Sequence, residues 1–270
     1  MEAIDKVFAG SIPEIYERFL VPLLFESYAL DLANRLANIE PRDVLETAAG
    51  TGVLTRAMAS RIPATVRIVA TDLNQSMLDH ASTRFSQKDR VEWRQADALA
   101  LPFPDQSFDV VACQFGVMFF PDKLQGFKEA LRALRPGGHF LFSVWDRISE
   151  NDFADVVTEE LAALFPHDPP RFLARTPHGY HDVEQIGQQL KAAGFRNVSS
   201  QAVDRQSKAA SPRDVAVAYC QGTPLMNEII ARDASRLEEA TQKAAEALAE
   251  RFGTGTIEGR IRAFVITAAR

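Results

Sequence analysis

The nine residues VLETAAGTG, Val44 to Gly52, constrain the fold of this chain more than any other stretch. They begin with apolar, partly β-branched residues that suit a buried parallel strand, and they change to small residues before a second apolar run. This order predicts a strand, a tight turn and a helix, and Thr51 and Thr55 are expected to serve the first N–H groups of that helix. Gly50 and Gly52 allow a sharp turn and a close ligand, and a helix start of this kind favours an anionic group. The turn is therefore a candidate ligand site.

The spacing of the glycines indicates which ligand fits. A dinucleotide-binding turn needs G-x-G-x-x-G, and the two possible registers place Val53 or Thr55 at the third glycine. The stretch instead has an acidic residue at the strand end, followed by small residues at every second position: Glu46, Ala48, Gly50 and Gly52. This pattern resembles motif I of the class I S-adenosylmethionine (SAM) dependent methyltransferases, D/E-x-G-x-G-x-G, with alanine at the first glycine. The resemblance implies SAM as cofactor and S-adenosylhomocysteine (SAH) as product.

Two further acidic residues fit the same family. The run VRIVATD predicts a second strand that ends at Asp72, where a doubly wound fold places its acceptor for ribose hydroxyls. Asn74 is expected to cap the helix that follows. Asp97 and Ala98 follow a third predicted strand and match the family position beside the adenine. The segment D-A-x-x-L-P-F-x-D-x-S-F-D then resembles the branch that includes quinone and sterol methyltransferases. The resemblance implies the following cofactor-binding residues: Tyr16, Glu46, Ala48, Gly50, Gly52, Asp72, Leu73, Asp97, Ala98, Gln114, Phe115 and Val117.

The order of predicted elements fits the resemblance well over about residues 42 to 146 and more loosely at the two ends of the chain. Strands are expected at Phe108 to Gln114, His139 to Asp146, Phe195 to Gln206 and 260 to 270, with helices between them. Pro22 is expected to break the N-terminal helix, and RPGG, residues 135–138, is expected to form a turn before the strand at His139. The implied fold is α/β: a Rossmann-like seven-stranded sheet, mostly parallel with an antiparallel last strand, with helices on both faces and a helical cap or lid. We expect a cap over residues 1–40, a SAM-binding core over 41–146, a substrate lid over 147–181 and the remaining sheet over 182–270. A helical insertion at 211–252 is either part of the lid or a homodimer surface.

The segment after the fifth predicted strand is dense in proline, histidine and aromatic residues. It holds the candidates for a base that deprotonates the acceptor: His167, Asp168, His178, Tyr180 and His181. Their spacing fits no standard metal motif, so no metal is predicted. Methyl transfer is an in-line displacement that depends mainly on alignment, and it needs a base only when the acceptor must lose a proton. The sequence therefore leaves O-, N- and C-methylation open.

Charge and composition narrow the function further. A net charge of -6 argues against nucleic acid as the main ligand, because the phosphate backbone attracts a basic face. No long apolar run and no signal-peptide pattern are present, which predicts a cytoplasmic protein without a membrane span. We predict a SAM-dependent methyltransferase for a small apolar or aromatic acceptor. The alternatives are a noncatalytic SAM- or SAH-binding regulatory protein and, with weaker support, an NAD-dependent oxidoreductase.

Overall fold

A computed structural model describes residues 12–85 and 91–270 of the chain. The chain divides into two compact units, each assembled from separate stretches of sequence. The sheet unit comprises residues 26–144, 181–203 and 263–270. The helical unit comprises the residues up to Phe25 together with 145–180 and 204–262. Part of the predicted N-terminal cap, residues 1–11, lies outside the described residues.

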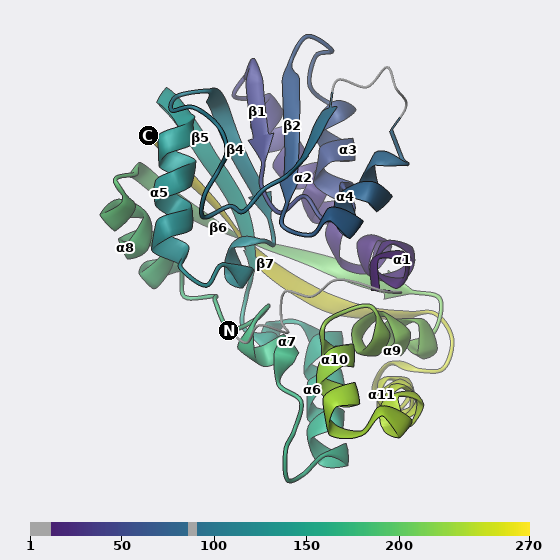
Figure 1. Ribbon diagram of the computed structural model, residues 1–270. Coiled ribbons are helices and arrows are strands. Elements are labelled where there is room, and N and C mark those ends of the chain that lie inside the picture. Colours follow the sequence, from purple (N-terminus) through teal and green to yellow (C-terminus); the bar gives the residue numbers. More distant parts are fainter. Residues whose placement is uncertain (1–11, 86–90) are drawn as a thin grey trace. The chain divides into compact units, whose positions relative to one another are not determined.

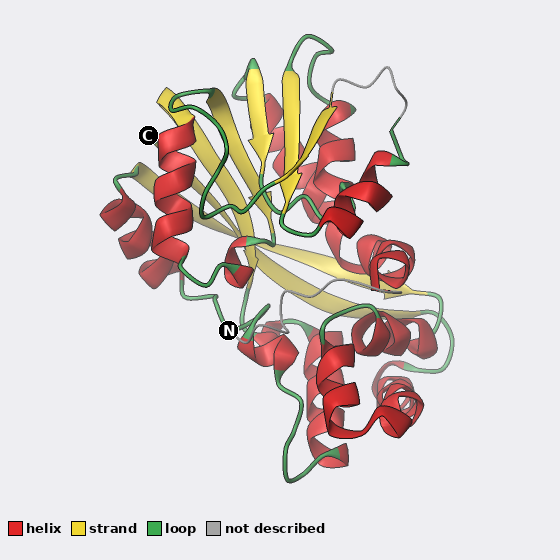
Figure 2. Ribbon diagram, in the orientation of Figure 1, coloured by secondary structure: helices red, strands yellow, loops and turns green. Residues whose placement is uncertain are grey.

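The strands form one seven-stranded sheet in the order β3-β2-β1-β4-β5-β7-β6. Neighbouring strands among the first five in this order are parallel. The predicted fold, a mostly parallel Rossmann-like sheet with an antiparallel last strand, is confirmed (Figure 2). Strand order reverses at β1 and β4, and ligands of such sheets bind at the carboxyl ends of the strands beside this point. The strands are β1 (Asp43–Glu46), β2 (Arg67–Asp72), β3 (Val91–Gln95), β4 (Phe108–Gln114), β5 (Leu134–Trp145), β6 (Arg196–Ala209) and β7 (Ile257–Ala269).

The central strands of the sheet unit form its core. Val44 and Leu45 of β1 and Val110 and Val111 of β4 are fully buried, as apolar runs in a parallel sheet require. In Figure 1, α2 lies beside α3 and α5 lies beside α8. The helices of this unit are α2 (Glu26–Ala37), α3 (Val53–Ala59), α4 (Gln75–Ser82), α5 (Lys123–Ala133), α8 (Val183–Ala193) and the short 3-10 turn η3 (Val117–Phe119).

The helical unit is held together by a buried carboxylate as well as by apolar packing. Glu228 of α10 is 4% exposed; it pairs with Arg175 at 2.6 Å and accepts the main-chain N–H groups of Arg171 and Phe172. It therefore satisfies the start of α7 from a distant part of the chain. Helix α11 packs against both α9 and α6, and Figure 1 shows it beside α9. The elements are α1 (Ile12–Ile15), the π-helix η2 (Tyr16–Phe25), η4 (Ile148–Glu150), α6 (Asp152–Leu164), α7 (Phe172–Arg175), α9 (Pro212–Gln221), α10 (Leu225–Asp233), η5 (Ala234–Arg236) and α11 (Leu237–Phe252).

Several predicted boundaries differ from the structure. Pro22 does not break the N-terminal helix but lies inside the π-helix η2, whose hydrogen-bond spacing differs from that of an α-helix. The predicted turn RPGG is part of β5, where an irregular register pairs Phe108 with Leu134 and Val110 with His139. Strand β7 begins at Ile257, before the predicted position, because buried and exposed residues already alternate from there.

Arg132 of α5 fixes the loop of the quinone and sterol signature. Its guanidinium donates to the carbonyl oxygens of Leu101 (2.9 Å) and Phe103 (2.7 Å) and to the carboxylate of Asp105 (2.8 Å). Glu129 holds the same guanidinium and accepts the Leu101 N–H. Asp105 is thus a loop-fixing residue, as its turn chemistry predicts.

Replacing Arg132 with alanine should lower the free energy of unfolding by about 1–3 kcal/mol, because two carbonyl groups and two carboxylates lose a charged donor. Urea denaturation measures the change. The matched control is Arg213→Ala, since Arg213 pairs with Glu238 on an exposed surface and should change stability by less than about 0.5 kcal/mol. Equal losses in the two variants would show that the loop does not depend on Arg132.

Candidate cofactor site

The turn between β1 and α3 has the backbone that motif I predicts. Ala48, Gly50 and Gly52 all have positive φ, at 54°, 56° and 79°. A methyl group on Gly52 would lie 2.9 Å from Cη2 of Trp93, so this position has no room for a side chain. A methyl group on Gly50 would meet no atom within 4 Å. The turn is therefore closed at Gly52 and open at Gly50, where a ligand can approach the backbone.

Ala48 occupies the first glycine position of the motif at the cost of a left-handed backbone. Its side chain is accommodated by the end of β4: a methyl group on Gly116 would lie 2.4 Å from Cβ of Ala48 and 2.7 Å from Sγ of Cys113. The departure from the family pattern at Ala48 is thus matched by the absence of a side chain at Gly116.

Asp72 ends β2 and holds the motif turn in place. Its side chain is 7% exposed and accepts the N–H of Gly50 at 2.9 Å and the N–H of Asn74 at 2.8 Å. Burial raises the pKa of this carboxyl, and the bonds to Asn74 and Gly50 oppose the rise. The prediction that the Asn74 side chain caps α4 is wrong. That side chain instead donates to the carboxylate of Asp72. Asp72 is therefore already oriented at the strand end.

Glu46 ends the neighbouring strand β1 and is 1% exposed. Its Oε2 accepts the hydroxyl of Thr55 at 2.6 Å. Burial raises the pKa of Glu46 to about 8, although the Thr55 hydrogen bond opposes this. The sequence predicts that Thr55 accepts from N–H groups at the start of the helix. Its hydroxyl instead donates to Glu46 across the turn, a hydrogen bond that the sequence motif does not indicate.

The other predicted cofactor residues lie mostly at this carboxyl edge of the sheet unit. Leu73 follows Asp72 and is 44% exposed, which is unusual for a large apolar side chain and leaves it available to a flat apolar ligand. Asp97 is exposed and accepts the N–H of Leu99, which lies two residues further along the chain, with Ala98 between them. At the end of β4 the side chains are buried: Gln114, Phe115 and Val117.

Two residues here were not singled out from the sequence. Tyr28 is fully buried, donates its hydroxyl to the carbonyl oxygen of Val203 and meets the ring of Phe115 edge to face at 5.4 Å. Trp93 of β3 closes the Gly52 side of the turn. The predicted residue Tyr16 belongs to the helical unit, where it stacks on Phe25 at 5.1 Å, and its cofactor role stays a prediction.

The candidates for an acceptor base differ in their exposure and in their partners. His167 is exposed, and Asp168 is exposed and paired with Arg232 at 3.0 Å. His181 belongs to the sheet unit, whereas the other candidates belong to the helical unit. Tyr180 is buried, and burial raises the pKa of its phenol, which makes it a poor base.

His178 has the environment of an oriented imidazole. It is 6% exposed, and its Nδ1 lies 2.8 Å from the main-chain oxygen of Asp146. Because a carbonyl oxygen can only accept, Nδ1 carries the proton, and Nε2 of the neutral ring is an acceptor. The ring lies near Trp145, with centroids 6.0 Å apart. Among the candidates, His178 is thus the one whose tautomer suits a base.

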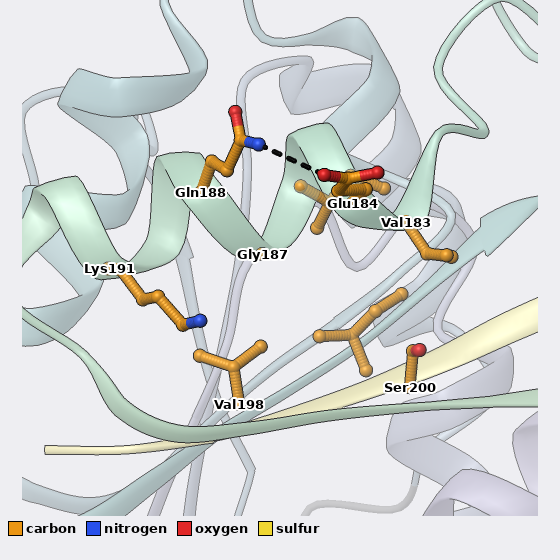
Figure 3. Close-up of a pocket in the computed structure, with 9 residues that line it drawn as sticks. Val183, Glu184, Gly187, Gln188, Lys191, Val198 and Ser200 are labelled. Carbon is orange, nitrogen blue, oxygen red and sulfur yellow. Dashed lines mark hydrogen bonds between the residues drawn. The ribbon is translucent and has the colours of Figure 1, made fainter.

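A separate cavity of about 310 Å³ lies between α8 and the strands β6 and β7 (Figure 3). Val198, Ser200 and Ile266 line its strand side, and Glu184 and Gln188 of α8 bond to each other at 3.4 Å on its helix side. None of the predicted cofactor residues lines it. The motif turn and this cavity are therefore distinct features of the sheet unit.

Within residues 12–85 and 91–270, no group of three or more His, Cys, Asp or Glu side chains has an arrangement that would hold a metal ion. In the same part of the chain, no helix has both the length and the apolar character needed to cross a membrane.

Replacing Asp72 with alanine should weaken SAH binding by about 1–3 kcal/mol, because a ligand hydroxyl and the Gly50 N–H both lose their acceptor. Calorimetric titration measures this loss. The control is Asp79→Ala on the exposed face of α4, where the carboxylate meets only the Gln75 side chain among the described contacts. A folded Asp72→Ala protein with unchanged affinity would remove Asp72 from the site.

Comparison with known proteins gives a consistent result. Residues 44–138 match the family described as "Methyltransferase domain". The "Ubiquinone/menaquinone biosynthesis C-methyltransferase UbiE" of Ectopseudomonas mendocina is 30% identical over 211 residues, which cover 73% of this chain and 77% of the relative. The "Demethylmenaquinone methyltransferase" of Deinococcus radiodurans is also 30% identical over 211 residues, covering 72% of this chain and 86% of the relative.

Solved structures share the fold at lower identity. The YcgJ protein from Bacillus subtilis is 19% identical with a TM-score of 0.57, covering 90% of this chain and 98% of that one. A phosphoethanolamine N-methyltransferase 2 from Haemonchus contortus, solved with SAH, is 17% identical with a TM-score of 0.61, covering 99% of this chain and 59% of that one. These similarities extend over β1 to β7 and not only over the motif turn.

Proposed function

Since the chain belongs to the class I SAM-dependent methyltransferases, we propose that it methylates a ring carbon of a small, hydroxylated aromatic acceptor of the quinol kind. The acceptor class rests on the two relatives that are 30% identical, one named as a ubiquinone/menaquinone biosynthesis C-methyltransferase and the other as a demethylmenaquinone methyltransferase. A ring hydroxyl makes such an acceptor reactive, because its loss of a proton places electron density on the neighbouring carbon. A cytoplasmic location is part of the same proposal.

The cofactor assignment is supported chiefly by the turn between β1 and α3, which is open at Gly50 and whose Gly50 N–H donates to Asp72. When bound, SAM supplies an electrophilic methyl group. Asp72 accepts ribose hydroxyls in this proposal, while the main chain at Gly50 meets the ligand where no side chain intrudes. Leu73 offers an exposed apolar surface for the adenine, and Asp97 accepts from its amino group. Gln114 and the residues after it complete the site at the end of β4.

On the acceptor side we assign the base to His178. Its Nδ1 proton is held by the Asp146 carbonyl oxygen, so its Nε2 can take the proton of a ring hydroxyl. The helical unit also contains aromatic side chains: the ring centroids of Trp145 and Phe25 are 6.0 Å apart, and Phe25 stacks on Tyr16. These rings supply the apolar contacts that an aromatic acceptor needs.

The test is an activity assay with defined acceptors. The purified protein is incubated with SAM and a demethylated naphthoquinol, in parallel with a catechol and a primary amine. Mass spectrometry detects the transferred methyl group, and NMR locates it. Methylation of a ring carbon of the quinol supports the proposal. Methylation of the catechol oxygen or of the amine alone would contradict it, and NAD binding without SAH binding would contradict the cofactor assignment as well.

A further inference from the structure

Two buried carboxyl groups lie at the ends of neighbouring strands in the sheet unit. Glu46 ends β1 and Asp72 ends β2, and they are 1% and 7% exposed. The parallel register pairs Glu46 with Ala70, which places Asp72 just beyond it on the adjacent strand. Two negative charges so close in a buried environment repel each other, so a pair of this kind is favoured when one member keeps a proton.

The hydrogen bonds indicate which carboxyl keeps the proton. Asp72 accepts the main-chain N–H groups of Gly50 and Asn74 and, at 3.4 Å, the amide of Asn74. An N–H group can only donate, so these bonds favour the ionised form of Asp72 and oppose the burial that raises its pKa. Glu46 meets the hydroxyl of Thr55, which can donate or accept and therefore suits both forms of a carboxyl group. Glu46 is thus the member that can hold the proton.

The groups that face Glu46 from other elements do not reverse this assignment. Burial is the largest influence and raises the pKa of Glu46 to about 8; the Thr55 bond lowers it, Asp72 raises it and Arg56 of α3 lowers it. The Arg56 guanidinium also donates to the carbonyl oxygen of Thr51 at 2.7 Å. Cys113 of β4 is buried, and its thiol keeps its proton because burial raises its pKa to about 12.

We propose that SAM binding to this site expels one proton from Glu46 to solvent, and that the proton returns when the cofactor leaves. The proposal rests on the assignment of motif I as the cofactor site. Its physical basis is charge: SAM brings a sulfonium and an ammonium group, and positive charge near a buried carboxyl favours the ionised form. Glu46 would then be neutral in the empty protein, which avoids an uncompensated charge beside Asp72, and negative when the cofactor needs a counter-charge.

The proton can be counted by calorimetry without any turnover. SAM is titrated into the protein at pH 7, without acceptor, in phosphate and in Tris buffer, whose heats of ionisation differ. The dependence of the binding heat on the buffer gives the number of protons released. The matched variant is Glu46→Gln, which has the shape of the neutral acid and cannot ionise. The ammonium group of SAM titrates in both proteins, so the difference between them isolates Glu46.

We expect wild-type protein to release close to one proton more than Glu46→Gln. Equal counts in the two proteins would overturn the inference while leaving the cofactor site intact. Failure of the wild type to bind SAM would overturn the site assignment and the inference with it.

A second measurement on the wild type covers the case in which the variant does not fold. Its affinity for SAM, corrected for the titration of free SAM, should rise by up to about tenfold per pH unit from about pH 6 and level off above about pH 8, where Glu46 has already lost its proton in the empty protein. A flat profile would also overturn the inference.

Discussion

Replacing His178 with alanine should lower kcat by about 10²- to 10⁴-fold, the usual contribution of a general base, while SAH affinity stays within about twofold. The reason is the fixed tautomer: the Asp146 carbonyl oxygen accepts from the Nδ1–H group, so the basic nitrogen of the neutral ring is Nε2. Steady-state kinetics with the naphthoquinol and calorimetry with SAH measure the two quantities.

A second variant distinguishes the loss of the basic nitrogen from a loss of stability. His178→Asn places an amide N–H where Nδ1 was, so it can keep the bond to Asp146 but has no basic nitrogen. We expect its stability to stay close to that of the wild type and its kcat to be as low as that of the alanine variant. His167→Ala, in an exposed loop, is the matched control and should keep full activity. Normal turnover by a folded His178→Asn protein would exclude His178 as the base.

Replacing Gly116 with alanine should lower the free energy of unfolding by about 1–3 kcal/mol, the usual cost of extra volume in a packed core. The new methyl group would lie 2.4 Å from Cβ of Ala48 and 2.7 Å from Sγ of Cys113, which is too close for either contact. The strands β1 and β4, or the turn that holds Gly50, would have to move apart. We therefore also expect weaker SAH binding, measured in parallel with urea denaturation.

The cost at Gly116 should depend on Ala48. In Ala48→Gly the backbone keeps a positive φ that glycine adopts freely, and the side chain facing Gly116 is gone. The double variant should recover part of the stability lost in Gly116→Ala, with the Cys113 contact accounting for the rest. Strictly additive effects of the two substitutions would show that Ala48 and Gly116 do not share this space.

The fold was predictable from the sequence because its signals are local. Each parallel strand is a short apolar run, and Glu46 and Asp72 stand where two such runs end, so their place at one edge followed from strand order alone. The turn at Gly50 and Gly52 was predictable for the same reason, since glycines mark positive φ.

What the sequence could not supply are contacts between distant segments. Nothing in the chain indicates that Thr55 bonds to Glu46, or that Gly116 makes room for Ala48, because both depend on how strands and helices pack. The RPGG segment was misassigned because its proline and glycines suit a turn, whereas the pairing of β4 and β5 continues across an irregular register. Among the base candidates, burial and the bond to Asp146 single out His178, and neither is visible in residue spacing.

The position of β7 in the sheet has a consequence for how the chain assembles. β7 comes after β6 in the sequence but lies between β5 and β6 in space. During synthesis, β6 is therefore made before the strand that joins it to the rest of the sheet. It cannot pair with β7 until α9, α10 and α11 have also been synthesised. Pairing across so many residues is slow and leaves an unpaired strand edge exposed in the meantime. The nascent chain is thus most vulnerable to aggregation between the emergence of Arg196 and the arrival of Ile257.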